Sequence, residues 1–357
     1  MRLSNRIVVS PMCQYSADDG VASDWHLQHL VQLGYSGAGL VMVEATAVER
    51  RGRITHHCLG LYSDACEAAL NRALAAARRF TAADIRFGIQ LAHAGRKASV
   101  YRPWDKRHGP LGPDDDPWPA VGPSSAAFDP AWPVPEALDE AGLERVREAF
   151  ASAAQRAVRV GFDAIELHAA HGYLLHEFLS PIANQRTDSY GGSVENRMRF
   201  PLAVLRAVRA ITPARVAVGV RITGTDWLQG GWTIENAVAF ACALQEEGVD
   251  FVCVSSGGIS PAVAIPVEPG YQVPFAARIR HETGIATQTV GMILKPEQAE
   301  EIIASGKADM VTLARAFLDD PRWVWHAAES LGGSAYYPPQ YARASRSAWP
   351  GAALLRP

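Results

Sequence analysis

The sequence lacks the features that mark several common classes of protein. Its five cysteines are odd in number and scattered, and no Cys-x-x-Cys pair is present for zinc or an iron–sulfur cluster. Nowhere do about 18 apolar residues run together, as a membrane-spanning helix requires. The residues before Ile7 are too few and too polar for the apolar region of a signal peptide. We therefore expect a soluble, cytoplasmic protein with free thiols and no membrane partner.

An excess of charge of one sign is also missing. The chain has 34 Lys and Arg residues against 37 Asp and Glu residues, which gives a net charge of −3. This balance provides no basic field for a nucleic acid and no acidic tail, so we expect a small molecule as the partner. With 357 residues, of which 48% are hydrophobic, the chain can bury a large core, either as one barrel or as two ordinary domains.

What the sequence does contain is an alternation of apolar, β-branched runs with longer stretches of helical spacing. This pattern predicts parallel strands joined by crossover helices. Eight such units predict an α/β fold of one domain, a (β/α)8 TIM barrel. No repeat of about 20–50 residues indicates a solenoid. The predicted strands are 6–10, 39–44, 85–91, a run after Gly161 that ends at His168, 216–222, 251–254, 286–290 and 310–313.

Local signals mark the ends of the predicted helices. Asp24, Asp139 and Ser193 can each accept hydrogen bonds from the first turn of a helix. Pro296 suits a first helical turn, and Gly306 lies just beyond a last one. The predicted helices are 24–35, 65–80, one behind Asp139 that reaches Val160, a short one over 174–179, one behind Ser193, 234–247, 275–282, one that starts at Pro296, and a final one with Trp323 and Trp325.

Two stretches fall outside this alternation. Residues 94–138 follow the third strand with little periodicity, nine prolines and three tryptophans. A loop of this length in a compact domain is normally a lid, a binding loop or disordered, and the tryptophans favour a packed lid. Irregular sequence returns after the last predicted helix. We therefore assign 1–330 to the barrel, with 94–138 as its lid, and 331–357 to a C-terminal tail.

Polar residues at the strand ends are the candidates for chemistry, because a parallel barrel assembles its site at the carboxyl ends of the strands. The fourth strand is followed by His168, His171 and Tyr173. Two core histidines would be the simplest interpretation. Two imidazoles can also hold an oxygen that gains negative charge, and a tyrosine can supply a proton. Strands seven and eight end near Gly291 and Arg315, where barrels commonly bind the phosphate of a cofactor.

A metal site is the competing interpretation, because His168 and His171 could be two ligands three residues apart. A catalytic zinc needs a third protein ligand, whereas the other strand ends offer Gln90, Arg221 and Arg315. Guanidinium groups repel a cation. We expect no bound metal, and a metal-dependent TIM-barrel hydrolase remains the alternative.

Four stretches of the chain carry the motifs of one known family. They are 5–15 with Ser-Pro-Met-Cys-Gln-Tyr, 90–97 with Gln-Leu-Ala-His-Ala-Gly-Arg-Lys, 168–175 with His-Ala-Ala-His-Gly-Tyr, and 184–197 with Asn-Gln-Arg-Thr-Asp-Ser-Tyr-Gly-Gly. Through them the chain resembles the Old Yellow Enzyme family of FMN-dependent ene-reductases, in its thermophilic-like branch of YqjM-type and xenobiotic-reductase-type enzymes. The resemblance covers nearly the whole sequence.

The resemblance implies an NADPH dehydrogenase of the ene-reductase type, which binds FMN and takes hydride from NADPH or NADH. Its substrates would be electron-poor alkenes such as enones, enals, maleimides and nitroalkenes. His168 and His171 would bind the activating oxygen of the substrate, and Tyr173 would protonate the alkene. A non-catalytic flavin-binding redox sensor is the other use of such a site.

The resemblance also implies positions for the cofactor and for further substrate contacts. Tyr15 would donate a hydrogen bond in the substrate pocket, and Cys13 would tune the redox potential of the flavin. Arg343 and Trp349 in the tail would reach the active site of a neighbouring subunit, in a homodimer or homotetramer. The flavin would be held by Pro11, Met12, Cys13, Ala45, Gln90 and Arg221 around its ring, and by Gly291, Ala314 and Arg315 at its phosphate.

Overall fold

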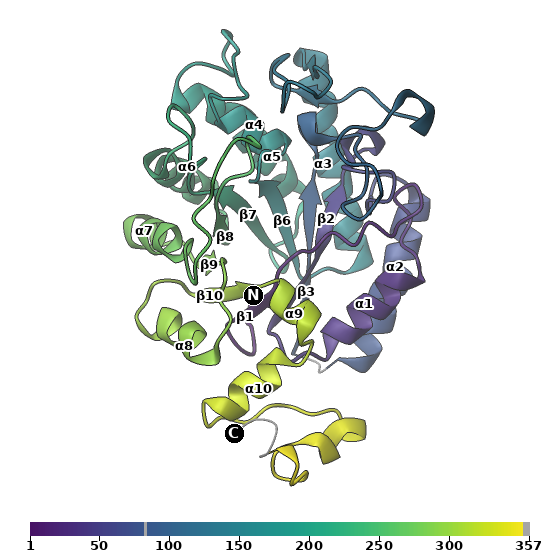
Figure 1. The fold of residues 1–357 in the computed structure, drawn as a ribbon, viewed down its shortest axis with the longest axis vertical. Coiled ribbons are helices and arrows are strands. Elements are labelled where there is room, and N and C mark those ends of the chain that lie inside the picture. Colours follow the sequence, from purple (N-terminus) through teal and green to yellow (C-terminus); the bar gives the residue numbers. More distant parts are fainter. Residues whose placement is uncertain (82–83, 353–357) are drawn as a thin grey trace.

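The computed structural model describes residues 1–81 and 84–352 of the chain. Its parallel strands close into one barrel, in the order β1-β10-β9-β8-β7-β6-β3-β2, and helices cover the outside of this barrel (Figure 1). The predicted (β/α)8 TIM barrel is confirmed. The barrel strands are β1 (Ile7–Val9), β2 (Leu40–Ala47), β3 (Arg86–Ala92), β6 (Ala164–Ala169), β7 (Ala217–Thr223), β8 (Phe251–Ser255), β9 (Thr287–Thr289) and β10 (Met310–Leu313).

The helices lie close to their predicted limits. Asp139 and Ser193 cap α3 and α5, as predicted, by accepting backbone hydrogen bonds from the first turns. The predicted cap at Asp24 is wrong. Ser23 is the N-cap, because Asp24 already lies in the first turn of α1, where its charge favours the positive end of the helix. The short α9 was not predicted. The helices are α1 (Asp24–Gly34), α2 (Asp64–Phe80), α3 (Glu140–Val160), α4 (Leu174–Leu179), α5 (Val194–Ile211), α6 (Ile234–Glu246), α7 (Val273–Thr283), α8 (Pro296–Ala304), α9 (Arg315–Asp319) and α10 (Trp323–Ser330).

Strand β2 continues beyond its predicted end at Glu44 and reaches Ala47. The pairing of β2 with β3 shifts register between Val43 and Ala45, and this irregularity lets the strand continue. Ala45, Thr46 and Ala47 therefore lie within the strand rather than in the loop after it.

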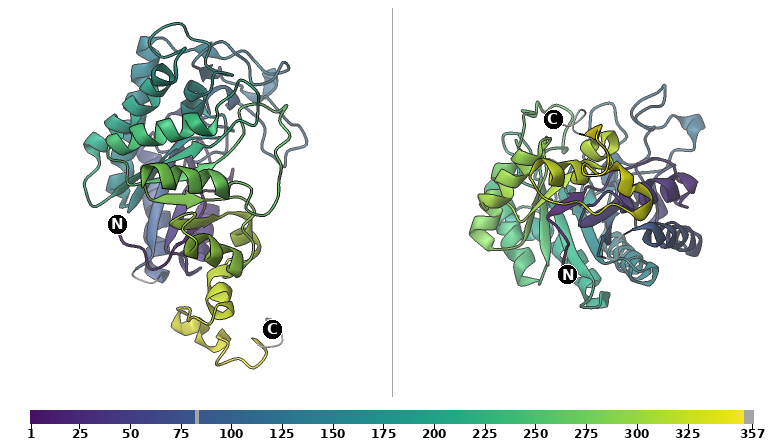
Figure 2. Two further views of the ribbon diagram at one scale, coloured as in Figure 1. Left: turned by 90° about the vertical axis from the view of Figure 1, so that its left-hand side faces the viewer. Right: turned by 90° about the horizontal axis from the view of Figure 1, so that it is seen from below.

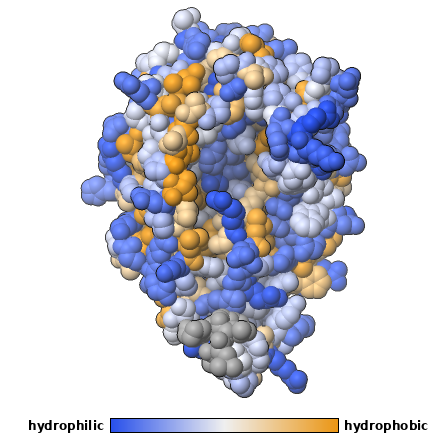
Figure 3. Space-filling model, viewed as in Figure 1, coloured by the Kyte–Doolittle hydropathy of each residue, from blue (hydrophilic) through white to orange (hydrophobic). Residues whose placement is uncertain are grey.

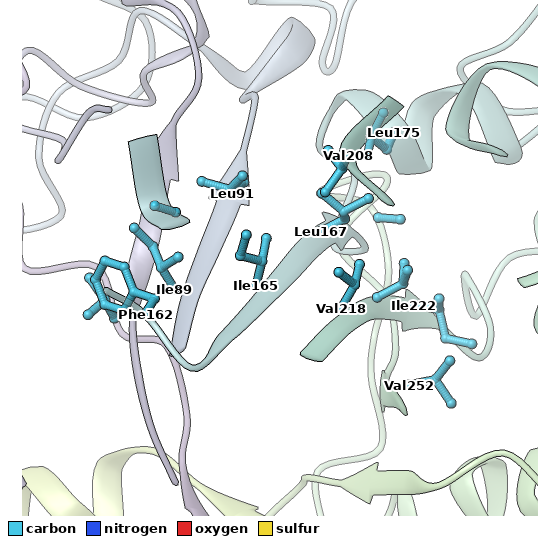
Figure 4. Packing of buried hydrophobic residues seen from close by; sticks show 14 of the residues in the cluster. Ile89, Leu91, Phe162, Ile165, Leu167, Leu175, Val208, Val218, Ile222 and Val252 are labelled. Carbon is cyan, nitrogen blue, oxygen red and sulfur yellow. The ribbon is translucent and has the colours of Figure 1, made fainter. Parts of the chain in front are cut away.

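Alternate residues of each strand point to opposite sides of the barrel wall. Leu91, Leu167 and Val218 belong to the large buried cluster that the strands share with the helices (Figure 4). The intervening positions, such as Gln90 and His168, therefore point into the barrel. Both of these side chains are buried.

Apolar side chains fill the amino end of the barrel interior. Gly219 provides room for one of them, because a Cβ at this position would lie 2.2 Å from the Phe251 ring. A packed plug at this end leaves the carboxyl ends of the strands as the open mouth of the barrel. The plug consists of Val8, Leu40, Met42, Ala164, Ala217 and Phe251.

The segment 94–138 has little regular structure, as predicted, and two of its tryptophans, Trp104 and Trp118, contact residues outside the segment. Trp118 Nε1 donates a hydrogen bond to the carbonyl of Arg51 (2.9 Å). The Trp104 ring meets the Tyr15 ring edge-on, with centroids 5.6 Å apart. The regular elements of the segment are the 3-10 turns η2 (Gly95–Lys97) and η3 (Pro113–Asp115) and the paired strands β4 (Val121–Gly122) and β5 (Glu136–Ala137).

The tail leaves α10 at the end of the molecule that lies opposite the lid segment (Figures 1 and 2). It contains the 3-10 turn η4 (Pro339–Ala344), whose Tyr341 packs against the rings of Tyr35 and Trp325. Residues 353–357 of the predicted tail lie outside the described residues. In the part of the chain that is described, no helix has the length and apolar character needed to cross a membrane.

Candidate active site

Two imidazoles meet at the carboxyl end of β6. His168 Nε2 and His171 Nδ1 are 3.4 Å apart. His168 Nδ1 accepts a hydrogen bond from the N–H of Ala170 (3.3 Å), which places the His168 proton on Nε2. His171 Nε2 lies 2.6 Å from Ser255 Oγ on β8. The structure thus brings together the two histidines singled out from the sequence and places His171 beside Ser255.

Both imidazoles are held in the neutral state. Burial lowers the pKa of His168 and of His171 well below the ordinary value, and the positive charge of Arg221 lowers it further. Arg221 pairs with His168 in the register of β6 and β7. Lys97 acts in the same direction from the other side. Each ring therefore keeps one N–H for donation at neutral pH.

Tyr173 lies beside His168, with ring centroids 4.9 Å apart and planes at 80°. Burial raises the pKa of its phenol, so the hydroxyl carries a proton across the physiological range. Lys97 Nζ lies 4.8 Å from the centre of the Tyr173 ring. Burial lowers the pKa of this lysine to about 8. A protonated phenol next to two neutral imidazoles forms a set of donors without a strong base.

A cleft of about 700 Å³ opens next to the imidazole pair. Figure 3 shows a hollow in this face of the molecule, bordered on one side by a band of hydrophobic residues. The cleft lies between the ends of β7, β8, β9 and β10. Its walls include His171, Arg221, Gly291, Ala314 and Arg315, which the sequence predicted, and Ser10, Ser255, Ser256, Tyr271, Gln272 and Thr312.

The walls of this cleft fit a phosphorylated flavin. The volume lies in the range of cofactor pockets, about 300–1,000 Å³. Arg221 Nε is buried in the wall and has no hydrogen-bond partner in the described chain, so a donor is left over for a ligand. Gly291 has φ of 110°, and a Cβ there would lie 2.8 Å from Gln272 Nε2, so only glycine suits this position. With Arg315 close by, the donors suit the acceptor-rich pyrimidine edge and phosphate of FMN.

Gln90 points into the barrel and is oriented by a buried carboxyl group. Its Nε2 donates to Glu166 Oε1 (2.7 Å), and Glu166 Oε2 has no hydrogen-bond partner in the described chain. Burial raises the pKa of Glu166, whereas the charge of Arg221 opposes this rise. Glu166 was not singled out from the sequence, although it precedes His168 by two residues on the same inward face of β6.

The segment after β1 brings a second group of predicted residues to the mouth. Pro11, Met12 and Cys13 are half-buried there. Burial, followed by the charge of Glu44, raises the pKa of the Cys13 thiol, which therefore stays protonated. Tyr15 has a left-handed backbone with φ of 46° and stands against Trp104 of the lid segment.

Ala45 and Tyr173 line a separate cavity of about 10 Å³, which has room for about one water molecule. Within one chain this cavity is too small for a substrate. Arg343 and Trp349 are exposed on the tail, and neither residue lines the cleft at the mouth of its own chain.

Several contacts at the mouth were missed from the sequence. Thr223 Oγ1 accepts a hydrogen bond from the N–H of His171 (3.1 Å), and Ser256 Oγ donates to Gln272 Oε1 (2.8 Å). For Ser255 and Ser256, the sequence signal is a run of small residues, 255–258, directly after a strand. Lys97 was noted within a motif but was given no role.

The arrangement also bears on the metal alternative. Within residues 1–81 and 84–352, no group of three or more His, Cys, Asp or Glu side chains could hold a metal ion. Two cations, Arg221 and Lys97, lower the pKa of both imidazoles. A hydrolase based on His168 and His171 would therefore lack a third ligand.

Comparisons with known proteins show the family of this chain. The family described as "NADH:flavin oxidoreductase / NADH oxidase family" matches residues 1–332. NADPH dehydrogenase of Geobacillus thermodenitrificans (strain NG80-2) is 43% identical over 348 residues, which cover 97% of this chain and 96% of that protein. The structure of morphinone reductase matches with a TM-score of 0.75 at 28% identity, over 95% of this chain and 89% of that chain.

A third match shows the fold alone. A 2-naphthoyl-CoA reductase structure has a TM-score of 0.81 at 23% identity, and the match covers 92% of this chain and 50% of that one. On the family match and the full-length relatives, this chain belongs to the NADH:flavin oxidoreductase family, as an FMN-dependent, NAD(P)H-using oxidoreductase of the Old Yellow Enzyme type.

Proposed function

We propose that this enzyme reduces electron-poor C=C bonds, such as those of enones, enals, maleimides and nitroalkenes. The observation that carries the proposal is the neutral His168–His171 pair, with the protonated phenol of Tyr173 beside it and Arg221 behind it. Such a pair can hold a carbonyl or nitro oxygen and stabilise the negative charge that develops on it during reduction of the conjugated bond.

Ser255 sets the protons that this task requires. His168 carries its proton on Nε2, which faces His171 Nδ1. When the Ser255 hydroxyl donates to His171 Nε2, the His171 proton lies on Nδ1. Two N–H groups then point at the same space, and an acceptor oxygen between them satisfies both. The pair therefore favours a ligand with an exposed oxygen.

The remaining step requires a proton at carbon. Bound FMN would supply the hydride chemistry between NADPH or NADH and the alkene. Tyr173 donates the proton to the other carbon of the double bond, because its phenol is protonated and stands next to the oxygen-binding imidazoles. Lys97, close to the face of the Tyr173 ring, stabilises the negative charge that the phenol acquires as the proton leaves.

The other predicted contacts belong to the same proposal. Cys13 and Tyr15 would border the substrate side of the flavin. Arg343 and Trp349 would act in a neighbouring subunit, which suits their exposure on a tail that leaves its own barrel at the floor. The flavin ring would lie among Pro11, Met12, Ala45, Gln90 and Arg221, and the phosphate among Gly291, Ala314 and Arg315.

An anaerobic visible spectrum tests the proposal. The purified enzyme should show flavin bands that bleach on addition of NADPH and return on addition of cyclohexenone. Bands that bleach with NADPH but do not return with cyclohexenone, a maleimide or a nitroalkene would contradict alkene reduction. A metal-dependent hydrolase would instead contain stoichiometric zinc and no flavin.

A further inference from the structure

The turn between the catalytic residues has an unusual backbone. His171 and Gly172 both adopt left-handed conformations, with φ of 60° and 71°. Such a conformation is costly for a histidine and persists only where the surroundings enforce it. At Gly172 a Cβ would lie 2.2 Å from the carbonyl oxygen of Gly258, so this turn also packs against the loop after β8. His171 and Tyr173 stand on either side of the turn, and its conformation therefore sets both side chains.

The N–H of Tyr173 closes this turn by donating to the carbonyl of Ala170 (3.2 Å), and three further hydrogen bonds hold it. The N–H of His171 donates to Thr223 Oγ1 (3.1 Å), and the carbonyl of His171 accepts from Lys97 Nζ (2.9 Å). The N–H of Gly172 donates to His176 Nδ1 (2.8 Å). The first of these three holds the N–H of His171. The other two hold the C=O and the N–H of one peptide group, the one that links His171 to Gly172.

His176 is itself oriented by a buried carboxylate. Its side chain and that of Asp226 are both fully buried, and His176 Nε2 lies 3.2 Å from Asp226 Oδ1. Asp226 Oδ2 accepts from Ser180 Oγ (2.6 Å) and from the N–H of Trp232 (2.8 Å). The His176 contact lowers the pKa of Asp226 against the effect of burial, so the carboxyl group stays ionised. An ionised Asp226 keeps the His176 proton on Nε2 and leaves Nδ1 free to accept from Gly172.

We propose that His176, with its tautomer fixed by Asp226, is a positioning residue for the reaction, because it holds the His171–Gly172 turn from which the oxygen-binding imidazole and the proton donor project. The inference rests on the proposed oxygen-binding role of His171. His176 acts through the peptide group of Gly172 and contacts neither substrate nor flavin.

The contacts of His176 and Asp226 predict which substitutions disrupt the turn. His176→Leu removes the acceptor for the Gly172 N–H. Asp226→Asn presents an NH2 group to His176, which moves the His176 proton to Nδ1. The Nδ1–H of His176 then faces the N–H of Gly172, and the hydrogen bond between them is lost. His176→Asn keeps an acceptor oxygen near the position of Nδ1. Ser180→Ala removes one donor from Asp226 but leaves His176 in place, and it serves as the matched control.

The affinity of the oxidised, FMN-loaded enzyme for 4-chlorophenol measures how tightly the His168–His171 pair binds an oxygen. This measurement needs no turnover. The titration is followed by the flavin absorbance and expressed per bound FMN. We expect His176→Leu and Asp226→Asn to weaken binding about tenfold, since each leaves a buried donor without an acceptor. His176→Asn should recover most of the affinity, and Ser180→Ala should bind as the wild type does.

A double-mutant cycle separates positioning from a general loss of stability. In the His171→Ala background, adding His176→Leu should change the affinity less than about twofold, since the positioned group is already gone. Equal weakening in both backgrounds, or unchanged affinity of the loaded His176→Leu enzyme, would overturn the positioning role. If His171→Ala itself left the affinity unchanged, the oxygen site would fail, and this inference would fail with it.

Discussion

Buried histidines occur in two arrangements in this molecule. In the first, a backbone N–H donates to Nδ1 and a carboxylate oxygen lies within 3.3 Å of Nε2. The three examples are His26 with Ser23 N–H and Glu44, His93 with Gly95 N–H and Glu49, and His176 with Gly172 N–H and Asp226. Each of these rings holds a loop near the mouth of the barrel.

His168 and His171 form the second arrangement. In the described part of the chain, no ion pair joins either ring to a carboxylate, and the cations Arg221 and Lys97 lower the pKa of both rings. Their facing nitrogens contact each other instead. A carboxylate would keep a buried imidazole fixed and occupied. Cations keep it neutral, with its N–H available to an outside oxygen, and this difference separates structural histidines from those that can bind a substrate.

Removing one ring from each arrangement should give the largest difference in the rate of flavin reoxidation. His168→Ala removes a donor to the substrate oxygen and should slow flavin reoxidation by cyclohexenone about 100-fold or more. His93→Ala breaks a carboxylate-paired ring and should lower the melting temperature, while the reoxidation rate per bound FMN stays near that of the wild type. Stopped-flow absorbance measures both rates. Equal losses of rate in the two variants would show that the arrangements do not differ in function.

Tyr173, the proton donor beside His168 and His171, should give a difference between the two half-reactions. Tyr173→Phe keeps the ring against His168 but removes the acidic O–H, so alkene-dependent reoxidation should fall about 100-fold. Reduction by NADPH should change by less than about threefold, because no proton from Tyr173 enters that step. The two half-reactions are measured separately under anaerobic conditions. A comparable loss in both would contradict the protonating role of Tyr173.

The sequence predicted the parts of this site that depend on one strand at a time. Apolar runs located the barrel strands to within a few residues, and the barrel rule then placed His168 and Arg221 at the mouth. The rule follows from strand geometry, since successive residues alternate between the interior and the helices. The same reasoning failed at Glu44, where a register shift extends β2, and at Asp24, where the preceding serine takes the cap.

Contacts between distant strands could not be predicted in this way. Ser255 reaches His171 across 84 residues, and Lys97 reaches the His171 carbonyl across 74. Both contacts depend on closure of the barrel and on the path of the lid segment, which no local pattern encodes. The same holds for the pairing of His176 with Asp226, because each alone resembles an ordinary polar residue in a loop or short helix.

Lowering the pH should decrease the free energy of unfolding through His168 and His171. The pKa values of His168 and His171 lie below those of the unfolded chain, so below about pH 6.5 the unfolded chain binds protons that the folded chain does not. The free energy of unfolding should therefore fall with falling pH, by at most about 1.4 kcal/mol per pH unit for each ring. Replacing both rings with Asn should remove this slope in urea titrations between about pH 4.5 and 6.5. His281→Asn, at an exposed position on α7, should leave the slope as it is.

Glu177 is a buried carboxyl group with no imidazole beside it. Its effect on the free energy of unfolding should be the smallest of those predicted, and it should have the opposite dependence on pH. Its Oε1 accepts from the N–H of Arg96 (2.9 Å), and burial raises its pKa to about 8. The folded chain therefore keeps a proton that the unfolded chain loses above about pH 4.3. The stabilisation from this group is complete below that pH and is lost as the pH rises toward 8.

Glu177→Gln should remove this dependence. Measured by urea unfolding, the variant should gain stability relative to the wild type from about pH 5 to pH 8, by at most about 1.4 kcal/mol per pH unit. Glu246→Gln, at an exposed position on α6, is the control and should show no such gain. A constant difference between the Glu177→Gln variant and the wild type across this range would mean that Glu177 is ionised in the folded protein. The carboxylates near the mouth would then not depend on an imidazole partner to carry their charge.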